Sequence, residues 1–203
     1  MTPRQIEKFF TGLSKELGCA ATVYLTGAAA GALLGRVRPS LDIDFGLVLS
    51  GRSKRSWEDV ALAVRRTSSI MAIAASVAAD IDRWGMITLL DYKRSSTKMF
   101  QCGLLQVRVL APLNWSIGKI TRFIEPDIHD VVDVFRKRHI TFKSAAALWG
   151  KALRASPSST SQFLFRRNVE HFFTDRGKGI WGRRFDPEEA ISAFHRAAKI
   201  RAG

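Results

Sequence analysis

The sequence predicts an α+β fold, in which a front domain of strands and helices is followed by a helical rear domain. Segments with the apolar pattern of strands occur only before Ala111-Pro112, where about four or five of them fit. After Pro112, apolar residues recur only at helical spacing. We therefore expect two domains, at residues 1–111 and 112–203.

The front domain is expected to begin with an amphipathic helix and to continue as strands and helices. Thr2 and Pro3 suit the start of a helix over residues 3–17, whose apolar residues recur at helical spacing. A further helix is expected at 56–75, and a short one after Gly27. Alternating or continuous apolar patterns predict strands at 23–25, 41–49, 76–81, 87–92 and 104–110.

The rear domain is expected to consist of helices joined by short loops. The apolar spacing predicts helices at 112–122, 127–137, 142–154, 162–173 and 187–200. Asp186 suits the N-cap of the last one. Three glycines and several cations within residues 176–184 predict a mobile basic loop that follows a phosphate backbone. The aromatic residues around this loop have mostly helical spacing and are expected in the core.

The composition is that of a globular protein with an unusual charge. The chain has 203 residues, of which 46% are hydrophobic and 25% charged, so it is expected to bury a core. Its 32 Lys and Arg against 18 Asp and Glu give a net charge of +14. A polyanionic partner is expected, and nucleic acid is the commonest one. A basic surface without a partner is the alternative.

Cysteines and apolar runs indicate a cytoplasmic location. Cys19 and Cys102 fit neither a metal-binding spacing nor a disulfide framework. The N-terminus lacks the apolar centre of a signal peptide. No apolar run approaches the roughly 20 residues that a membrane helix needs. We therefore expect a protein that does not enter a membrane.

Two aspartates on one predicted strand indicate a metal site. Asp42 and Asp44 lie two residues apart, so their side chains project from one face of the strand, while Ile43 projects from the other. Adjacent carboxylates repel each other unless a cation neutralises them. Oxygen-only ligands favour Mg²⁺, which typically binds one or two carboxylates together with substrate phosphates. The alternative is an edge strand with two solvated carboxylates.

A small-residue turn precedes this strand and is suited to bind phosphate. The turn is Thr26-Gly27-Ala28, at the end of the predicted strand 23–25 and at the start of a helix. Glycine lets the backbone approach phosphate oxygens, and the N-terminus of the following helix attracts anions. The turn and the aspartate pair therefore favour a site for a metal-bound phosphate compound.

The order of these motifs resembles that of the nucleotidyltransferase superfamily, which has the polymerase-beta-like fold. More narrowly, the chain resembles the minimal bacterial nucleotidyltransferases related to AbiEii toxins of type IV toxin–antitoxin systems. The resemblance covers roughly residues 20–138. The first motifs are a glycine turn at Gly27, then an arginine and a hydroxyl residue, Arg38 and Ser40, before the acid-x-acid strand with Asp42 and Asp44. The later motifs are a lysine, Lys119, and an arginine followed by two acids three residues apart, which are Arg122, Asp127 and Asp130.

The resemblance implies a mixed-sheet nucleotidyltransferase domain whose cleft is completed by the helical domain. It implies a Mg²⁺-dependent or Mn²⁺-dependent transfer of a nucleoside monophosphate from an NTP to an acceptor, with release of pyrophosphate. The basic rear domain favours RNA as that acceptor, and the toxin resemblance suggests tRNA. It also implies that a cognate antitoxin protein is a partner.

The same resemblance assigns a role to each motif. Asp42 and Asp44 would hold the metal, and Lys119 would neutralise the triphosphate. Two acids of a later helix, Asp127 and Asp130, would face the cleft and pair with the lysine or act near the base or the metal. The nucleotide would be bound by Thr26, Gly27, Ala28, Arg38 and Ser40. A third metal-binding acid is expected at Asp91 on the predicted strand 87–92, with Asp80 and Asp82 as competing candidates.

Several alternatives remain open from the sequence. Lys119 could be a surface lysine, and Asp127 could be an ordinary N-cap. Ala28 lacks the hydroxyl that many family members carry at this turn, so the fold could bind nucleic acid without catalysis. An enzyme that modifies a protein or a small molecule is the third hypothesis.

Overall fold

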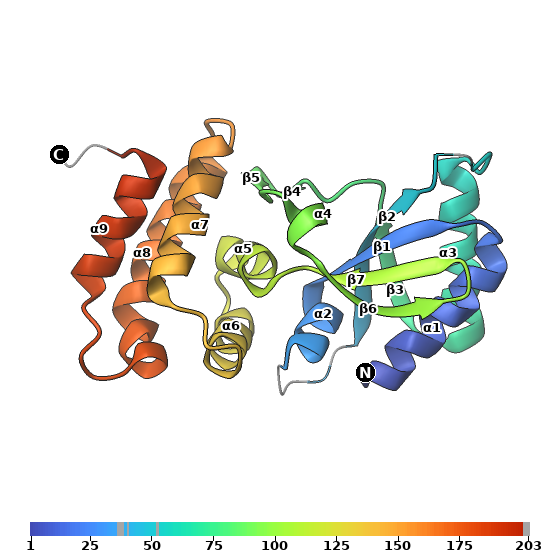
Figure 1. The fold of residues 1–203 in the computed structure, drawn as a ribbon, viewed down its shortest axis with the longest axis horizontal. Coiled ribbons are helices and arrows are strands. Elements are labelled where there is room, and N and C mark those ends of the chain that lie inside the picture. The colour runs from blue at the N-terminus through green and yellow to red at the C-terminus, as the bar shows by residue number, and fades with distance from the viewer. Residues whose placement is uncertain (36–38, 40, 52, 201–203) are drawn as a thin grey trace. The chain divides into compact units, whose positions relative to one another are not determined.

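A computed structural model of the chain describes residues 1–35, 39, 41–51 and 53–200 (Figure 1). Two units are compact in themselves. Unit 1 comprises Met1–Ile81 and Lys93–Ala111, and unit 2 comprises Asp82–Tyr92 and the chain from Pro112 onward. The division at residue 111 therefore coincides with the predicted one, whereas residues 82–92 group with the rear helices.

Unit 1 is built on a five-stranded mixed sheet in the order β3-β2-β1-β7-β6. The strands β1 and β2 are antiparallel, β1 and β7 are parallel, β2 and β3 are parallel, and β6 and β7 are antiparallel. The predicted α+β class is confirmed at this level, with a mixed sheet in unit 1 and helices in the rear. The strands are β1 (Ala21–Thr26), β2 (Asp42–Leu49), β3 (Ala74–Ala78), β6 (Thr97–Cys102) and β7 (Leu105–Val109).

Three helices pack with this sheet: α1 (Pro3–Leu17), α2 (Gly27–Leu34) and α3 (Trp57–Met71). The helix α1 begins with a capping box between Thr2 and Gln5, and it ends at Gly18, whose φ is 64°. Its apolar face is fully buried. Phe9 and Phe10 make edge-on ring contacts with Phe45 of β2, at centroid distances of 6.4 and 5.2 Å. The face of β2 that carries Phe45 is therefore the core face.

The predicted strand 87–92 is wrong. Only Ile87–Thr88 is extended, as β5, and it pairs with β4 (Arg83–Trp84) in a two-stranded hairpin of unit 2. The chain then turns at Asp91, whose φ is 47°, into the short helix α4 (Tyr92–Ser95). The apolar side chains that suggested a strand are buried without joining the main sheet, as at Leu89.

Unit 2 is helical apart from the hairpin, with α5 (Pro112–Arg122), α6 (Glu125–Lys137), α7 (Phe142–Ala155), α8 (Thr160–Trp181) and α9 (Pro187–Ala198). Its core is aromatic. Trp149 stacks on Phe135 at 5.7 Å between centroids, and the Phe172 ring is nearly perpendicular to both, at 79° and 83°. These contacts join α6, α7 and α8, so the core of unit 2 lies between these helices.

The predicted basic loop at 176–184 is wrong over residues 176–181, because α8 continues to Trp181, and the turn begins only at Gly182. Tertiary contacts outweigh the low helix propensity of its glycines. Gly177 is buried against the Phe185 ring, where a Cβ would overlap it. Arg136 donates hydrogen bonds to the Gly179 carbonyl at 2.6 and 3.0 Å, so helix α6 supports this part of α8.

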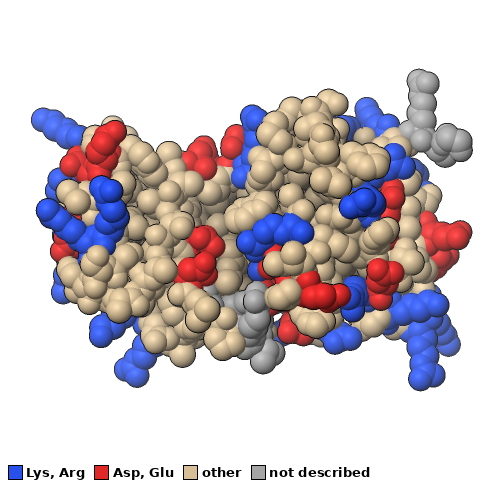
Figure 2. Space-filling model, turned by 180° about the vertical axis from the view of Figure 1, so that it is seen from behind, with Lys and Arg blue, Asp and Glu red and all other residues tan. Residues whose placement is uncertain are grey.

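Charged side chains cover much of the surface. Lys and Arg, with fewer Asp and Glu among them, occur at many places on the face in Figure 2. None of the helices in the described ranges has both the length and the apolarity that crossing a membrane requires.

A half-buried ion pair network joins α8 to α9. The Glu170 carboxylate accepts from Arg166 Nε at 2.8 Å and lies 2.6 Å from His195 Nε2. Burial opposes ionisation of Glu170, but the hydrogen bonds of Arg166 and His195 outweigh it, so the pKa of Glu170 lies below its usual value.

This network predicts a pH-dependent contribution to stability. A carboxyl with a lowered pKa in the folded state stabilises the fold above its unfolded pKa, and this contribution is lost as the pH falls through the folded pKa. Glu170→Gln should therefore cost on the order of 1 kcal/mol at pH 7, and the cost should shrink below about pH 4. Urea unfolding of both proteins across this pH range measures it. A cost that does not change with pH would contradict the assignment.

Candidate functional site

The aspartate pair of unit 1 lies on β2 as the sequence predicts. Ile43 and Phe45 are buried in the core at 0% and 2% exposure, while Asp42 is exposed and Asp44 is half-buried. The two carboxylates therefore belong to the face of β2 opposite the core face. The edge-strand alternative is wrong, because β2 lies between β3 and β1.

Asp44 packs against the first residue of α2. In the antiparallel register Asp44 pairs with Thr26, the buried residue that precedes this helix. Gly27 has φ of 62°, and a Cβ at this position would lie only 2.9 Å from the Asp44 Cβ and would overlap the Asp44 carboxylate. Only glycine fits both the backbone and this close approach. The turn at Gly27 thus brings the N-terminus of α2 beside the Asp44 side chain.

This arrangement suits a hard cation with a bound phosphate compound. Asp42 and Asp44 supply only oxygen donors, and the exposure of Asp42 leaves it accessible to an ion. The N-terminus of α2 carries backbone N–H groups and a partial positive charge, both of which favour phosphate. Two further predicted nucleotide-binding residues, Arg38 and Ser40, lie outside the described residues.

The predicted third acid, Asp91, is exposed in a turn of unit 2 and does not lie on a strand. Of its competitors, Asp80 pairs with Lys93 Nζ at 3.5 Å within unit 1, and Asp82 lies 3.7 Å from Arg83 Nε within unit 2. Among the described residues, no three His, Cys, Asp or Glu side chains form a group that could hold a metal ion. The metal hypothesis therefore rests on Asp42 and Asp44.

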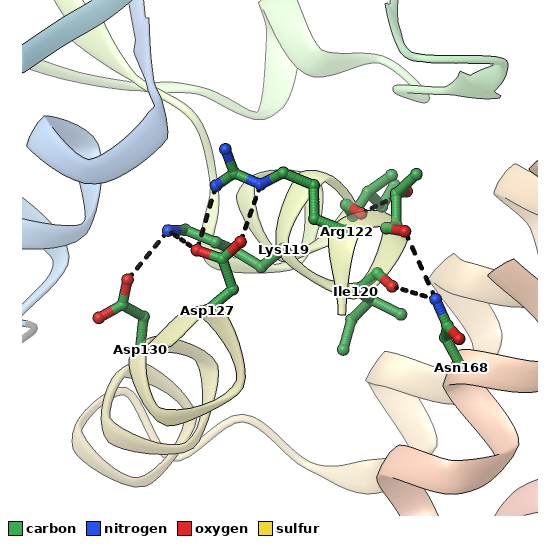
Figure 3. Close-up of polar contacts among 8 residues, drawn as sticks. Lys119, Ile120, Arg122, Asp127, Asp130 and Asn168 are labelled. Atoms are coloured by element: carbon green, nitrogen blue, oxygen red, sulfur yellow. Dashed lines mark hydrogen bonds and ion pairs between the residues drawn. The ribbon is translucent and has the colours of Figure 1, made fainter. Parts of the chain in front are cut away.

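The later lysine and acids come together in unit 2 (Figure 3). Lys119 Nζ lies 2.5 Å from Asp127 Oδ1 and 2.9 Å from Asp130 Oδ2. Arg122 also binds Asp127, with Nε 2.8 Å from Oδ2 and Nη2 3.1 Å from Oδ1. The side chains of Lys119, Asp127 and Asp130 are each almost fully buried. Two cations and two anions thus balance inside one cluster.

Helix geometry explains how this cluster forms. Lys119 and Arg122 are three residues apart on α5, and Asp127 and Asp130 are three apart on α6, so each pair lies on one side of its helix. The helix α6 begins at Glu125 after the N-cap Ile124. Asp127 is therefore not an N-cap, and Lys119 is not a surface lysine, so both of these alternatives are wrong.

Lys119 is buried within its ion pairs, and its expected role of neutralising a triphosphate stays a prediction. At 2% exposure, its ammonium is held by two carboxylates and lies 5.6 Å from the centre of the Trp115 ring. An uncompensated buried charge is costly. Removing this ammonium would therefore destabilise the contact between α5 and α6, where it pairs with Asp127 and Asp130. Lys119 therefore holds Asp127 and Asp130 together within unit 2.

Two residues of this region received no role from the sequence: Arg122, which was named only as the arginine of the later motif, and Asn168, which was not named. Arg122 is the accessible cation of the cluster, with 45% of its side chain exposed, and its guanidinium lies over the Trp84 ring at 5.6 Å. Asn168 of α8 is buried and donates to the Ile120 carbonyl at 2.9 Å (Figure 3). The sequence signal for Asn168 is an asparagine among the aromatic residues of the predicted helix 162–173. The structure thus adds one candidate contact residue and one support residue.

The candidate residues fall into two groups, one in each unit. Gly27, Asp42 and Asp44 come together in unit 1, and Lys119, Asp127 and Asp130 come together in unit 2. That both groups serve one reaction stays a prediction.

Comparisons with known proteins provide no functional assignment for this chain. A scan against protein-family models, a search of curated proteins and a search of solved structures found no match. The resemblance to nucleotidyltransferases therefore rests on the order of the motifs and on the local geometry of the two groups.

Proposed function

We propose that this protein is a Mg²⁺-dependent nucleotidyltransferase that moves a nucleoside monophosphate from an NTP to RNA. The observation that supports it most is the placement of Asp44 against Gly27. Through this contact an acid-x-acid strand lies beside a helix N-terminus. Carboxylates that would bind a metal ion are thereby next to backbone N–H groups that would donate hydrogen bonds to phosphate.

In the proposed reaction, a hydroxyl oxygen of the acceptor forms a bond to the α-phosphorus of the NTP. The bond from that phosphorus to the bridging oxygen breaks, pyrophosphate leaves, and the hydroxyl proton passes to solvent or to a carboxylate. Bound by Asp42 and Asp44, Mg²⁺ would neutralise charge on the phosphates and stabilise the attacking and leaving oxygens. The backbone N–H groups at the start of α2 would hold the triphosphate, and Gly27, which has no side chain, lets Asp44 lie beside them.

The charge of the chain favours a polyanionic acceptor. A net charge of +14 would attract RNA and raise its association rate at low salt. The family resemblance extends the proposal to tRNA as the acceptor and to a cognate antitoxin that restrains the enzyme.

A second candidate is a protein that binds RNA on the same fold without catalysis. Two observations favour it. Ala28 places a methyl group where a hydroxyl could contact phosphate, and the ammonium of Lys119 is already held by two buried carboxylates. Under this hypothesis the cations would serve binding alone.

A labelling experiment tests the proposal. The full chain is incubated with total RNA and each of the four NTPs, labelled in turn at the α- and the γ-phosphate, with Mg²⁺ or with EDTA. We expect label on RNA from the α-labelled NTP only, and only with Mg²⁺. Label on a protein in a lysate instead would identify a different acceptor. No transfer to any acceptor would contradict the proposed activity and favour the second candidate.

A further inference from the structure

Unit 2 contains a cavity of about 530 Å³ where the turn between α6 and α7 meets the C-terminal end of α8. This volume falls within the range of small-molecule sites, which is roughly 300–1,000 Å³. Phe142, Trp181 and Phe185 line it together with three cations, Arg136, Lys143 and Arg184. No Asp or Glu is among the described residues that line it. We call it the α6/α8 pocket.

The aromatic wall of the α6/α8 pocket is held in place by packing and by one hydrogen bond. Trp181 Nε1 donates to the Ile140 carbonyl at 2.8 Å. Its ring lies 4.8 Å from that of Phe185, and the Phe142 and Phe185 rings lie 5.4 Å apart, centroid to centroid. Phe185 is buried, whereas Phe142 and Trp181 are only half-buried. Phe142 and Trp181 are therefore the partly exposed rings of this wall, and Lys143 Nζ lies over the Phe142 ring at 5.7 Å from its centre.

The cations around this wall come from two segments that contain no acidic residue. Residues 136–143 and 176–184 each hold four Lys or Arg and no Asp or Glu. Arg184 is exposed and makes no hydrogen bond or ion pair with another residue in the described ranges, whereas Lys143 Nζ forms an exposed ion pair with Glu189 Oε1 at 3.9 Å. Lys and Arg side chains gather at the lower right of Figure 2, the end of unit 2 where α8 turns into α9.

We infer that the α6/α8 pocket binds an unpaired nucleotide of an RNA chain, with its base against Trp181 or Phe142 and its flanking phosphates at Arg184 and Lys143. Aromatic rings stack on any base, and neighbouring cations track the phosphates, which is the usual chemistry of single-strand recognition. Bases inside a duplex are paired and not available for such stacking. An acidic protein would use the cations but would leave the aromatic wall uncovered.

This inference rests on the proposed function only for its choice of RNA, and it does not require catalysis. It assigns to unit 2 the binding of the acceptor strand. The site is separate from the Lys119 cluster, with which it shares no residue.

Photocrosslinking tests where the RNA binds. The full chain carrying Asp42→Asn is irradiated with an unstructured RNA that contains 4-thiouridine, and the adducts are mapped by mass spectrometry. We expect adducts on peptides that contain Phe142 or Trp181. Adducts confined to other peptides would overturn the inference. If transfer activity is absent but these adducts form, only the proposed function fails; if transfer occurs without these adducts, only the inference fails.

Affinity measurements with matched variants test the chemistry. Arg184→Ala should weaken binding of the single-stranded RNA about five- to tenfold and lower its salt slope by about 0.7, whereas Phe142→Leu should weaken binding similarly without changing the slope. Lys151→Ala removes an exposed cation of α7 outside the pocket and is the control. Equal effects of Arg184→Ala and Lys151→Ala would overturn the inference, as would equally tight binding of duplex RNA or polyglutamate. Thermal melts of each variant verify that it is folded.

Discussion

Replacing either Asp42 or Asp44 by asparagine should reduce nucleotide transfer about 10³-fold without unfolding unit 1. The loss of one carboxylate charge weakens metal binding, and a metal ion contributes several kcal/mol to stabilising the transition state of such reactions. Asparagine has nearly the same shape, so the packing of Asp44 against Gly27 is kept. Initial rates of α-labelled transfer at fixed Mg²⁺ measure the loss.

Asp175→Asn is the matched control for this loss. It makes the same chemical change at an exposed position of α8. Asp175 belongs to unit 2, whereas the aspartate pair belongs to unit 1. We expect it to keep the rate of the unmodified protein. Equal rates for Asp44→Asn and Asp175→Asn would show that the acid-x-acid strand is not the catalytic site.

Lys119→Met should lower the free energy of unfolding of unit 2 by about 3–5 kcal/mol. This change leaves Asp127 and Asp130 almost fully buried without the ammonium that contacts both. Arg122 still binds Asp127 but lies at the exposed end of the cluster. Denaturant unfolding of the full chain, followed by the fluorescence of the buried Trp115 and Trp149, measures the loss.

Two further variants separate charge from packing at Lys119. Lys119→Met combined with Asp127→Asn and Asp130→Asn should recover part of the lost stability, because no uncompensated charge then remains among the three. Lys151→Met, at an exposed position of α7, should change stability little. If Lys119→Met behaved like Lys151→Met, the buried cluster would not stabilise unit 2.

Local patterns predict those elements whose own residues determine them. The helix at residues 3–17 has a capping box, one apolar face and a terminal glycine, and the structure has α1 at the same residues. The alternation around Ile43 and Phe45 likewise predicts the faces of β2. Both elements bury one face against a core, so their periodicity is strong.

Elements that depend on distant partners were not predictable in this way. The strand β6 is mostly exposed and lies at the edge of the sheet, so its sequence has little apolar alternation. The end of α8 contains glycines that disfavour helix, yet Phe185 and Arg136 hold it in place from other parts of unit 2.

The same distinction applies to the candidate site. The spacing of Asp42 and Asp44 is local, so their common face could be read from the sequence. The contact between Gly27 and Asp44 depends on the register of β1 with β2. The burial of Lys119 depends on where α6 places two acids, which spacing on α5 alone does not reveal.

Calorimetric titration with a non-hydrolysable NTP tests the central claim most directly, because it asks whether the Asp42 and Asp44 face binds a metal-bound nucleotide. The full chain should bind the analogue with Mg²⁺ and not with EDTA, and Asp44→Asn should abolish the Mg²⁺-dependent part while Asp175→Asn retains it. No binding with Mg²⁺, or binding of equal strength by the unmodified protein and Asp44→Asn, would contradict the account.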